Sequence, residues 1–337
     1  MNTLAYRPSG LLHWLAPKLN MQSSALLACV GTEVRSLTAW KALKAASMIS
    51  VAKFIRVTAH QRTRHDQKAA DMYNARVQEL TAAHGNPNDI TELQLLVRFG
   101  DIVSFADEFL DGVGQSVAID ISALPKRFFF PIVRRVLDRQ PPIATVVALY
   151  TRPAQYPSGP LAEDPEEWDH LPLFAGNAGY KQDSPESLVI GVGFEPLGLQ
   201  AHVEQGDLPV RLLLPFPAPA RAYRRSWELA RLLQKNRRTE HVRLYRTDPF
   251  DPSDTFDRLI SLTSGGQRRT LLAPYGPKPM SLGMALFARL TETPVYYTQP
   301  IVYRPDYSEG VAQSDGHPTT LMYVLRLAGR DLYALPS

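Results

Sequence analysis

Short apolar runs alternate with longer amphipathic runs along most of the chain, and this alternation restricts the folds that the chain can adopt. The apolar runs predict strands at 25–30, 53–58, 93–97, 117–121, 144–150, 187–192, 210–215, 241–246, 270–273, 295–299 and 320–327. The amphipathic runs predict helices at 36–46, 66–84, 102–110, 127–138, 222–234, 253–264 and 280–290. Strands separated by helices form βαβ units, so the sequence predicts an α/β fold with mostly parallel sheets.

Proline interrupts this rhythm between residues 153 and 186. Six of the 28 prolines lie here, at positions 153, 157, 160, 165, 172 and 185. An acidic cluster accompanies them, made of Glu163, Asp164, Glu166, Glu167 and Asp169. A structureless segment of this length is unusual inside a compact domain. The sequence therefore predicts an N-terminal half with an N-terminal arm at 1–152, a Pro-rich acidic insertion or linker at 153–186, and a C-terminal half at 187–337.

A repeated pattern relates these two halves. In each half a strand ends in a glycine that precedes a glutamate by two positions, and a later strand leads through a Pro-Lys turn into a helix. The residues are Gly31, Glu33 and Lys126 in the first half, and Gly193, Glu195 and Lys278 in the second. The pattern favours an internal duplication, with two Rossmann-like halves in pseudo-twofold arrangement and the turns facing one shared cleft. Chance similarity between two α/β units is the alternative.

The Pro-Lys turns have chemistry that suits an anion. Helix N-termini carry unpaired N–H groups and a partial positive charge, and a lysine beside them strengthens the attraction for phosphate. Gly276 permits close backbone approach before Lys278. The alternative is that Pro-Lys only marks the start of a helix and leaves the lysine in solvent.

Two short motifs resemble one family of ligand-binding domains. The segment 275–282, Tyr-Gly-Pro-Lys-Pro-Met-Ser-Leu, and the segment 27–32, Leu-Ala-Cys-Val-Gly-Thr, resemble the strand–turn elements of CARF domains. CARF domains are Rossmann-like modules that bind cyclic oligonucleotides, and SAVED domains fuse two CARF-like halves. The resemblance implies a ligand site made of Gly31, Thr32, Lys126, Gly193, Glu195, Tyr275, Gly276 and Lys278. The chain departs from the family at the Gly-Thr that precedes the lysine, which is Leu124-Pro125 in one half and Gly276-Pro277 in the other.

Familiar catalytic motifs do not occur in the sequence. It has no Walker A pattern, no G-x-G-x-x-G and no G-x-S-x-G. The eight histidines show no metal-ligand spacing, and His60 and His65 lie in a stretch with Arg62 and Arg64 that is interpreted as solvated. We expect neither a metal nor a cofactor. The catalytic candidates are Glu33 and Glu195 at strand ends. Asp120, Asp248 and Asp251 are weaker candidates, for which helix capping or a structural role is favoured.

Charge and cysteine content restrict the expected binding partners and the cellular compartment. The net charge of +4 is small for 337 residues, which argues against a broad nucleic-acid surface. One cysteine, Cys29, excludes an intramolecular disulfide and fits the cytoplasm. No apolar run is long enough to span a membrane. Two local features stand out as contact surfaces for nucleic acid or a protein partner. They are the cluster Arg221, Arg224, Arg225 and Arg231, and the segment with Tyr296, Tyr297, Tyr303, Arg304 and Tyr307.

Together these observations predict a cytoplasmic sensor, or a subunit of a bacterial antiviral defence complex, that binds a nucleotide-type ligand such as a cyclic oligonucleotide. No effector domain is visible, so a separate effector protein is the expected partner. One alternative is a nucleotide hydrolase or glycosidase that uses Glu33 or Glu195. The other is a non-catalytic scaffold that binds a protein or nucleic acid through the insertion and the Tyr-rich segment.

Overall fold

The computed structural model describes residues 6–19, 21, 23–159, 161–177, 185–193, 199, 208–218, 220–236 and 242–336. Its contacts divide the chain into two units. Unit 1 comprises Met1–Glu163 and Ile301–Leu332, and unit 2 comprises Asp164–Pro300 and Tyr333–Ser337. Each unit is described by itself below.

The core of unit 1 is a mostly parallel sheet. Its strands follow the order β1-β15-β6-β5-β2-β3-β4, with β16 paired to β15. The bounds are β1 Ser9–Leu11, β2 Ser24–Cys29, β3 Ile49–Thr58, β4 Ile90–Gln94, β5 Ser116–Asp120, β6 Thr145–Thr151, β15 Thr320–Leu327 and β16 Arg330–Asp331. The five neighbouring strands β6, β5, β2, β3 and β4 are parallel to one another, whereas β15 runs antiparallel to β6.

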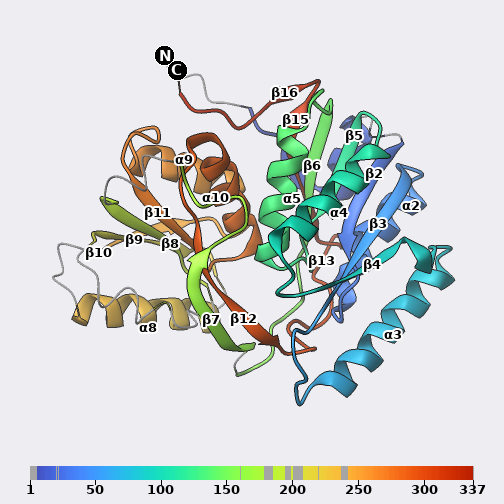
Figure 1. The fold of residues 1–337 in the computed structure, drawn as a ribbon, viewed down its shortest axis with the longest axis horizontal. Coiled ribbons are helices and arrows are strands. Elements are labelled where there is room, and N and C mark those ends of the chain that lie inside the picture. The colour runs from blue at the N-terminus through green and yellow to red at the C-terminus, as the bar shows by residue number, and fades with distance from the viewer. Residues whose placement is uncertain are drawn as a thin grey trace. The chain divides into compact units, whose positions relative to one another are not determined.

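Helices cover both faces of this sheet, because its central strands are apolar on both sides. Trp40 of α2 and Leu80 of α3 pack against one face with Leu26 and Phe54. On the other side, α4 and α5 lie next to each other over the sheet (Figure 1). The helix bounds are α1 Leu12–Leu15, α2 Thr38–Ala45, α3 Asp66–Ala82, α4 Phe99–Asp111 and α5 Lys126–Asp138. Short 3-10 turns are formed by Ala16–Leu19, Val34–Leu37 and Pro87–Asp89.

The strand order locates the edge of unit 1 at which sheets of this type commonly bind ligands. The chain runs outward from β2 to β3 and β4, then crosses back to β5 and β6 on the other side of β2. In such doubly wound sheets the carboxyl ends of the strands at the reversal point form the crevice. The α/β fold with Rossmann-like, mostly parallel winding that the sequence predicts is confirmed.

Unit 2 repeats the same winding on a smaller scale. Its parallel strands are β8 Ser187–Gly191, β9 Val210–Pro215, β10 Val242–Thr247 and β11 Thr270–Pro274, in the order β10-β9-β8-β11. Its helices are α8 Ala220–Asn236, α9 Pro252–Leu262 and α10 Lys278–Thr291. Among the parallel strands, the first therefore lies between the second and the fourth in both units, as β2 does between β3 and β5 and β8 does between β9 and β11. The duplication itself remains a prediction, which this shared order supports.

The end of the chain differs from the predicted division. The predicted C-terminal half extends to residue 337, whereas the contacts assign Ile301–Leu332 to unit 1. The strand predicted at 320–327 is β15, and it extends the sheet of unit 1 by pairing with β6. Part of the segment 153–186 is also regular, because β7 (Ala162–His170) pairs with β12 (Tyr296–Tyr303) and carries the acidic cluster. A small ribbon, β13 Gln313–Ser314 and β14 His317–Pro318, completes the strands.

In the part of the chain that the structure describes, no helix is both long and apolar enough to cross a lipid bilayer.

The turns after the first and fourth strands touch each other within each unit. A Cβ atom built on Gly31 would lie 3.5 Å from the Ala123 Cβ in unit 1. In unit 2 the fit is much tighter, because a Cβ on Gly193 would lie 1.8 Å from the Tyr275 carbonyl oxygen. Only glycine fits at position 193 without displacement of the neighbouring backbone.

We therefore expect Gly193→Ala to lower the free energy of unfolding by about 1–3 kcal/mol or more, because the added methyl group overpacks the turn. Gly114→Ala is the matched control, because no heavy atom outside its immediate chain neighbours lies within 4 Å of the added Cβ. It should change stability by less than about 0.5 kcal/mol. Urea unfolding of both variants measures the difference, and equal midpoints would show that the close approach is wrong.

Candidate functional site

The carboxyl edge of the sheet in unit 1 holds an open cavity of about 410 Å³. It lies where β2 and β3 end and α3 begins. Its lining residues are Val30, Gly31, Thr32, Arg56, Val57, Thr58, Ala59, His60, Gln61, Arg62, Asp66, Ala69, Ala70 and Tyr73. The volume falls in the range of small-molecule sites, about 300–1,000 Å³. Two of the predicted ligand residues, Gly31 and Thr32, therefore line one cavity.

An arginine and an aromatic ring form one wall of the cavity. The Arg56 guanidinium carbon lies 3.7 Å from the centre of the Tyr73 ring, and Arg56 Nη1 donates to Glu92 Oε1 at 2.5 Å. Burial raises the pKa of Tyr73, so its phenol remains protonated at neutral pH. This wall offers both a flat stacking surface and hydrogen-bond donors.

Another part of the lining is polar and more exposed. His60, Gln61 and Arg62 follow the end of β3 and are exposed to solvent. Asp66 brings the one carboxylate of the lining, and its Oδ1 accepts hydrogen bonds from Thr63 N at 3.0 Å and Thr63 Oγ1 at 2.8 Å. Since Arg56 and Arg62 outnumber Asp66, the formal charge of the lining is positive, which favours an anionic ligand.

Behind the turn after β2 lies a buried ion pair. Arg35 Nε donates to Glu33 Oε2 at 2.9 Å, and Arg35 Nη1 donates to the Thr151 carbonyl oxygen at 3.0 Å. Ser308 accepts from Arg35 Nε at 3.2 Å and donates to Glu33 Oε2. Burial alone would lower the pKa of Arg35, but the Glu33 carboxylate raises it above its usual value. The catalytic candidate Glu33 therefore lies in an ion pair that joins three segments.

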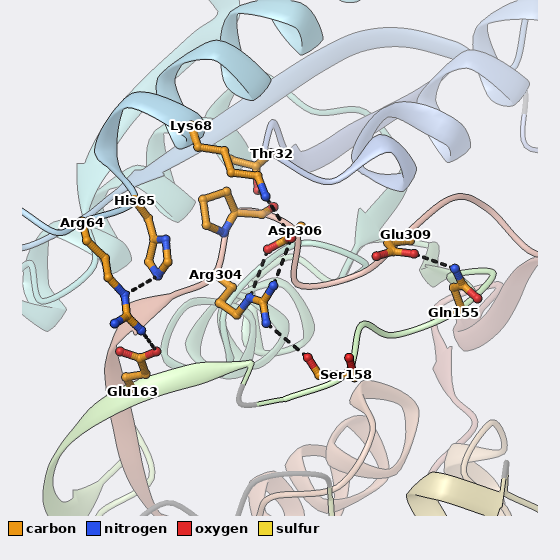
Figure 2. Close-up of polar contacts among 11 residues, drawn as sticks. Thr32, Arg64, His65, Lys68, Gln155, Ser158, Glu163, Arg304, Asp306 and Glu309 are labelled. Atoms are coloured by element: carbon orange, nitrogen blue, oxygen red, sulfur yellow. Dashed lines mark hydrogen bonds and ion pairs between the residues drawn. The ribbon is translucent and has the colours of Figure 1, made fainter.

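Ser308 belongs to a short segment, Arg304 to Glu309, that crosses this edge and is called the strap here. Thr32 Oγ1 donates to the Pro305 carbonyl oxygen at 2.6 Å, and Lys68 Nζ donates to Asp306 Oδ2 at 2.9 Å. Figure 2 shows Lys68 of α3 and Arg304 of the strap pointing toward Asp306 from two sides. The strap is thus attached to Thr32, which lines the cavity, and to α3, which forms its wall.

The Asp306 carboxylate is the most strongly held group of the strap. Arg304 donates to Oδ1 from Nε and to Oδ2 from Nη2, both at 3.1 Å. The hydrogen bonds from Arg304, followed by that from Lys68, lower the pKa of Asp306 to about 2. Further along, Gln155 Nε2 donates to Glu309 Oε2 at 2.5 Å, and Arg304 Nη1 donates to the Ser158 carbonyl oxygen at 3.3 Å (Figure 2). Charged groups therefore take part in most of the polar contacts of the strap.

Aromatic side chains pack beneath the strap. The Tyr307 ring meets Tyr156 edge-on with centroids 6.2 Å apart, and it meets Tyr303 at 6.0 Å. Burial raises the pKa of Tyr156 and of Tyr307. The sequence-based hypothesis assigns Tyr303 and Tyr307 to base stacking or to a partner interface. In the structure both contribute to the packing of unit 1.

The remaining predicted ligand residues lie at equivalent turns. Lys126 begins α5 and Lys278 begins α10. The Tyr275 hydroxyl lies 2.9 Å from Thr298 Oγ1, and burial raises its pKa to about 12. Gly276 is buried, and Gly193 packs against Tyr275. The other catalytic candidate, Glu195, lies outside the described residues.

The weaker candidates have local partners. Asp251 Oδ1 accepts from Ser253 N at 2.8 Å and caps α9, and Asp120 Oδ1 accepts from Ser122 N at 2.8 Å. Asp248 Oδ1 accepts from Phe250 N at 2.8 Å. On α8, Arg224 pairs with Glu228 at 2.9 Å and Arg231 is exposed. The side chains of Arg221 and Arg225 lie outside the described part.

Several cavity residues were not singled out from the sequence as site residues. They are Arg56, His60, Arg62 and Tyr73, together with Lys68 beside the cavity. The available signal was the basic stretch directly after the strand at 53–58, because a strand's carboxyl end is where α/β folds place ligands. The stretch is largely exposed to solvent, as interpreted from the sequence, and its residues His60 and Arg62 also line the cavity.

Comparison with known proteins supports the fold. No family model and no curated protein matches the chain. The solved structure of a Type III CRISPR defence DNA nuclease activated by cyclic oligoadenylate is similar with a TM-score of 0.50 and 11% identity. The match covers 82% of this chain and 65% of that chain, so it spans about two thirds of the nuclease structure. A universal stress protein from Archaeoglobus fulgidus matches at 11% identity over 84% of this chain and 98% of its own, with a TM-score of 0.24. At 11% identity, the similarity to the nuclease supports only a shared fold. The TM-score of 0.24 is too low for the stress protein to indicate even that.

The Asp306 contacts predict a pH-dependent contribution to stability. Because its pKa is lower in the folded protein than its usual value of 3.8, the contribution is complete above about pH 4 and is lost as the pH falls through about 2. Asp306→Asn should lower the free energy of unfolding at pH 7 by about 1–2 kcal/mol, since the side chain is partly solvated.

Urea unfolding of the wild type and Asp306→Asn between pH 7 and pH 2.5 measures this effect, and the gap between them should shrink toward acid. Asp111→Asn is the control, because its side chain is 82% exposed and its ion pair with Arg139 is long at 3.7 Å. A gap that stays constant with pH would show that Asp306 is not held as a carboxylate.

Proposed function

We propose that the protein is a sensor that binds a nucleotide-type ligand in the cavity of unit 1 and acts on a separate effector protein in a bacterial antiviral defence system. One observation carries the proposal. A cavity of suitable size lies at the carboxyl edge of a doubly wound sheet, lined by the Gly31-Thr32 turn, by two arginines and by Tyr73. This is the edge where such folds bind nucleotides.

The lining matches the parts of a nucleotide. A planar guanidinium such as that of Arg62 can bind a phosphate with two parallel hydrogen bonds. The flat surface of Arg56 and Tyr73 suits a base, because aromatic rings and guanidinium planes both stack on bases. Ala69 and Ala70 have small side chains and leave room along α3. The cavity would hold a mononucleotide, or one nucleotide of an oligomer.

A cyclic oligonucleotide is the proposed ligand class. The two short motifs that resemble CARF and SAVED domains support this class, and so does the similar fold of a nuclease that cyclic oligoadenylate activates. The turns with Lys126 and Lys278 stand as further proposed anion contacts.

A sensor also needs an element that responds to the ligand, and the strap has the required contacts. Thr32 and α3 serve both the cavity and the strap, since Thr32 Oγ1 donates to Pro305 and Lys68 donates to Asp306. Lys68, which pairs with Asp306, lies on α3 between the lining residues Asp66 and Ala69. A bound anion at this edge would compete with Asp306, so ligand binding would loosen the strap and expose a changed surface to the effector.

Arg62→Ala is expected to abolish ligand binding. At a ligand concentration of 100 times the Kd, binding stabilises a protein by about 2.7 kcal/mol, which raises the Tm by about 4 °C in a chain of this size. A thermal-shift screen with cyclic tri-, tetra- and hexa-adenylate, AMP and ATP should show such a rise for the wild type. The rise should be lost in Arg62→Ala.

The control is Arg98→Ala, which removes the same charge from a side chain that is 90% exposed and does not line the cavity. It should keep the full shift. Flat curves for the wild type with every ligand would refute the proposal. Hydrolysis of a stabilising nucleotide, lost in Glu33→Gln while binding persists, would favour the enzyme over the sensor.

A further inference from the structure

Unit 2 holds three aromatic rings beside one another, and two of them are exposed. Phe216, just after β9, is 43% exposed, and Trp227 of α8 is 39% exposed. Tyr223 lies between them, with ring centroids 6.4 Å from Phe216 and 6.2 Å from Trp227. The Tyr223 and Trp227 planes differ by only 9°, so the two rings offer nearly parallel surfaces.

The core side of α8 is distinct from the side that carries the exposed Trp227 ring. Ser226, Leu229 and Ala230 are buried, and the latter two belong to the core of unit 2. Tyr223, Trp227 and Arg231 instead follow one another at intervals of four residues, so they share one face of α8. Tyr223 is partly buried at the border of the core side, whereas Trp227 and Arg231 are exposed, so core packing does not explain the tryptophan at position 227.

Basic side chains surround the rings. The Arg246 guanidinium lies over the Phe216 ring, with its central carbon 4.7 Å from the ring centre. Arg224, Arg231 and Lys235 are exposed along α8. The helix sequence contains five basic residues and a single acidic residue, Glu228, which pairs with Arg224. This face therefore combines stacking surfaces with an excess of positive charge.

We propose that this face, formed by Phe216, Tyr223, Arg224, Trp227, Arg231 and Arg246, binds single-stranded nucleic acid. Bases stack on the rings, and the phosphates between them contact the guanidinium groups. Aromatic side chains interleaved with cations are the usual platform for single strands, because every base has a π face and every linkage carries a charge. In a duplex the base faces are stacked on one another, so they cannot stack on the aromatic rings. An acidic protein would be attracted by the charge but has no requirement for the ring alignment.

Fluorescence anisotropy with a labelled oligothymidylate of about 20 nucleotides tests this directly. The wild type should bind with an affinity that falls steeply with salt. Trp227→Ala should weaken binding by about 5- to 100-fold, since each stacked base contributes at that level. Arg246→Gln should reduce the slope of log affinity against log salt by about one.

Trp14→Ala is the matched control, because Trp14 is 59% exposed and belongs to unit 1. It should bind as the wild type does. An unchanged Tm for Trp227→Ala separates lost stacking from lost folding, and Arg246→Gln tests the face without removing a ring. Equal affinities of Trp227→Ala and Trp14→Ala, an absence of binding by the wild type, or equal competition by polyglutamate would overturn the proposal. A loss of oligothymidylate binding leaves the thermal shifts with cyclic adenylates untouched, so the two proposals fail separately.

Discussion

The guanidinium of Arg35 sets the arrangement of the carboxyl edge in unit 1. A buried charge is tolerated only when it is paired and its donors are satisfied, because removal from water costs several kcal/mol. Arg35 meets this demand with Glu33, with the Thr151 carbonyl oxygen at the end of β6, and with Ser308 of the strap. The turn after β2, the end of β6 and the strap are therefore held together by one cation.

Hydrogen bonds extend this order across the edge. Thr151 N donates to Ser122 Oγ at 2.7 Å, and the Thr151 and Thr320 hydroxyl oxygens lie 2.9 Å apart. These bonds connect the turn after β5, the end of β6 and the start of β15. The side of the edge next to β5 and β6 is thus closed by polar contacts, whereas the side between β2, β3 and α3 remains open as the cavity. A rigid edge beside an open cavity is the arrangement that holds a ligand in place.

Local patterns in the sequence predicted most of the regular structure. The strands 210–215 and 320–327 and the helices 66–84 and 127–138 lie within about two residues of their observed ends, because periodicity reports which face is buried. The return of residues 301–332 to unit 1 was not predicted, since β15 pairs with a strand about 170 positions earlier in the chain. The contacts of the strap could not be predicted for the same reason. Thr32 and Pro305 are far apart in the sequence, as are Lys68 and Asp306, and no motif links the partners. Gly31 and Thr32, which line the cavity, could be selected as candidates because a strand end precedes them, and Glu33 could be selected as a carboxylate at the same strand end. Its partner Ser308 could not be found from one sequence.

Hydrogen exchange of the full chain with and without cyclic tetra-adenylate tests the central claim most directly, because it reports the cavity and the strap in one experiment. If the ligand occupies the cavity and displaces Asp306, backbone amides at 57–62 and at 31–32 should exchange more slowly, while those at 304–309 exchange faster. Protection of the cavity segments without a change in the strap would contradict the switch. Unchanged exchange at both places, at a concentration that raises the Tm, would contradict the assignment of the site to this edge.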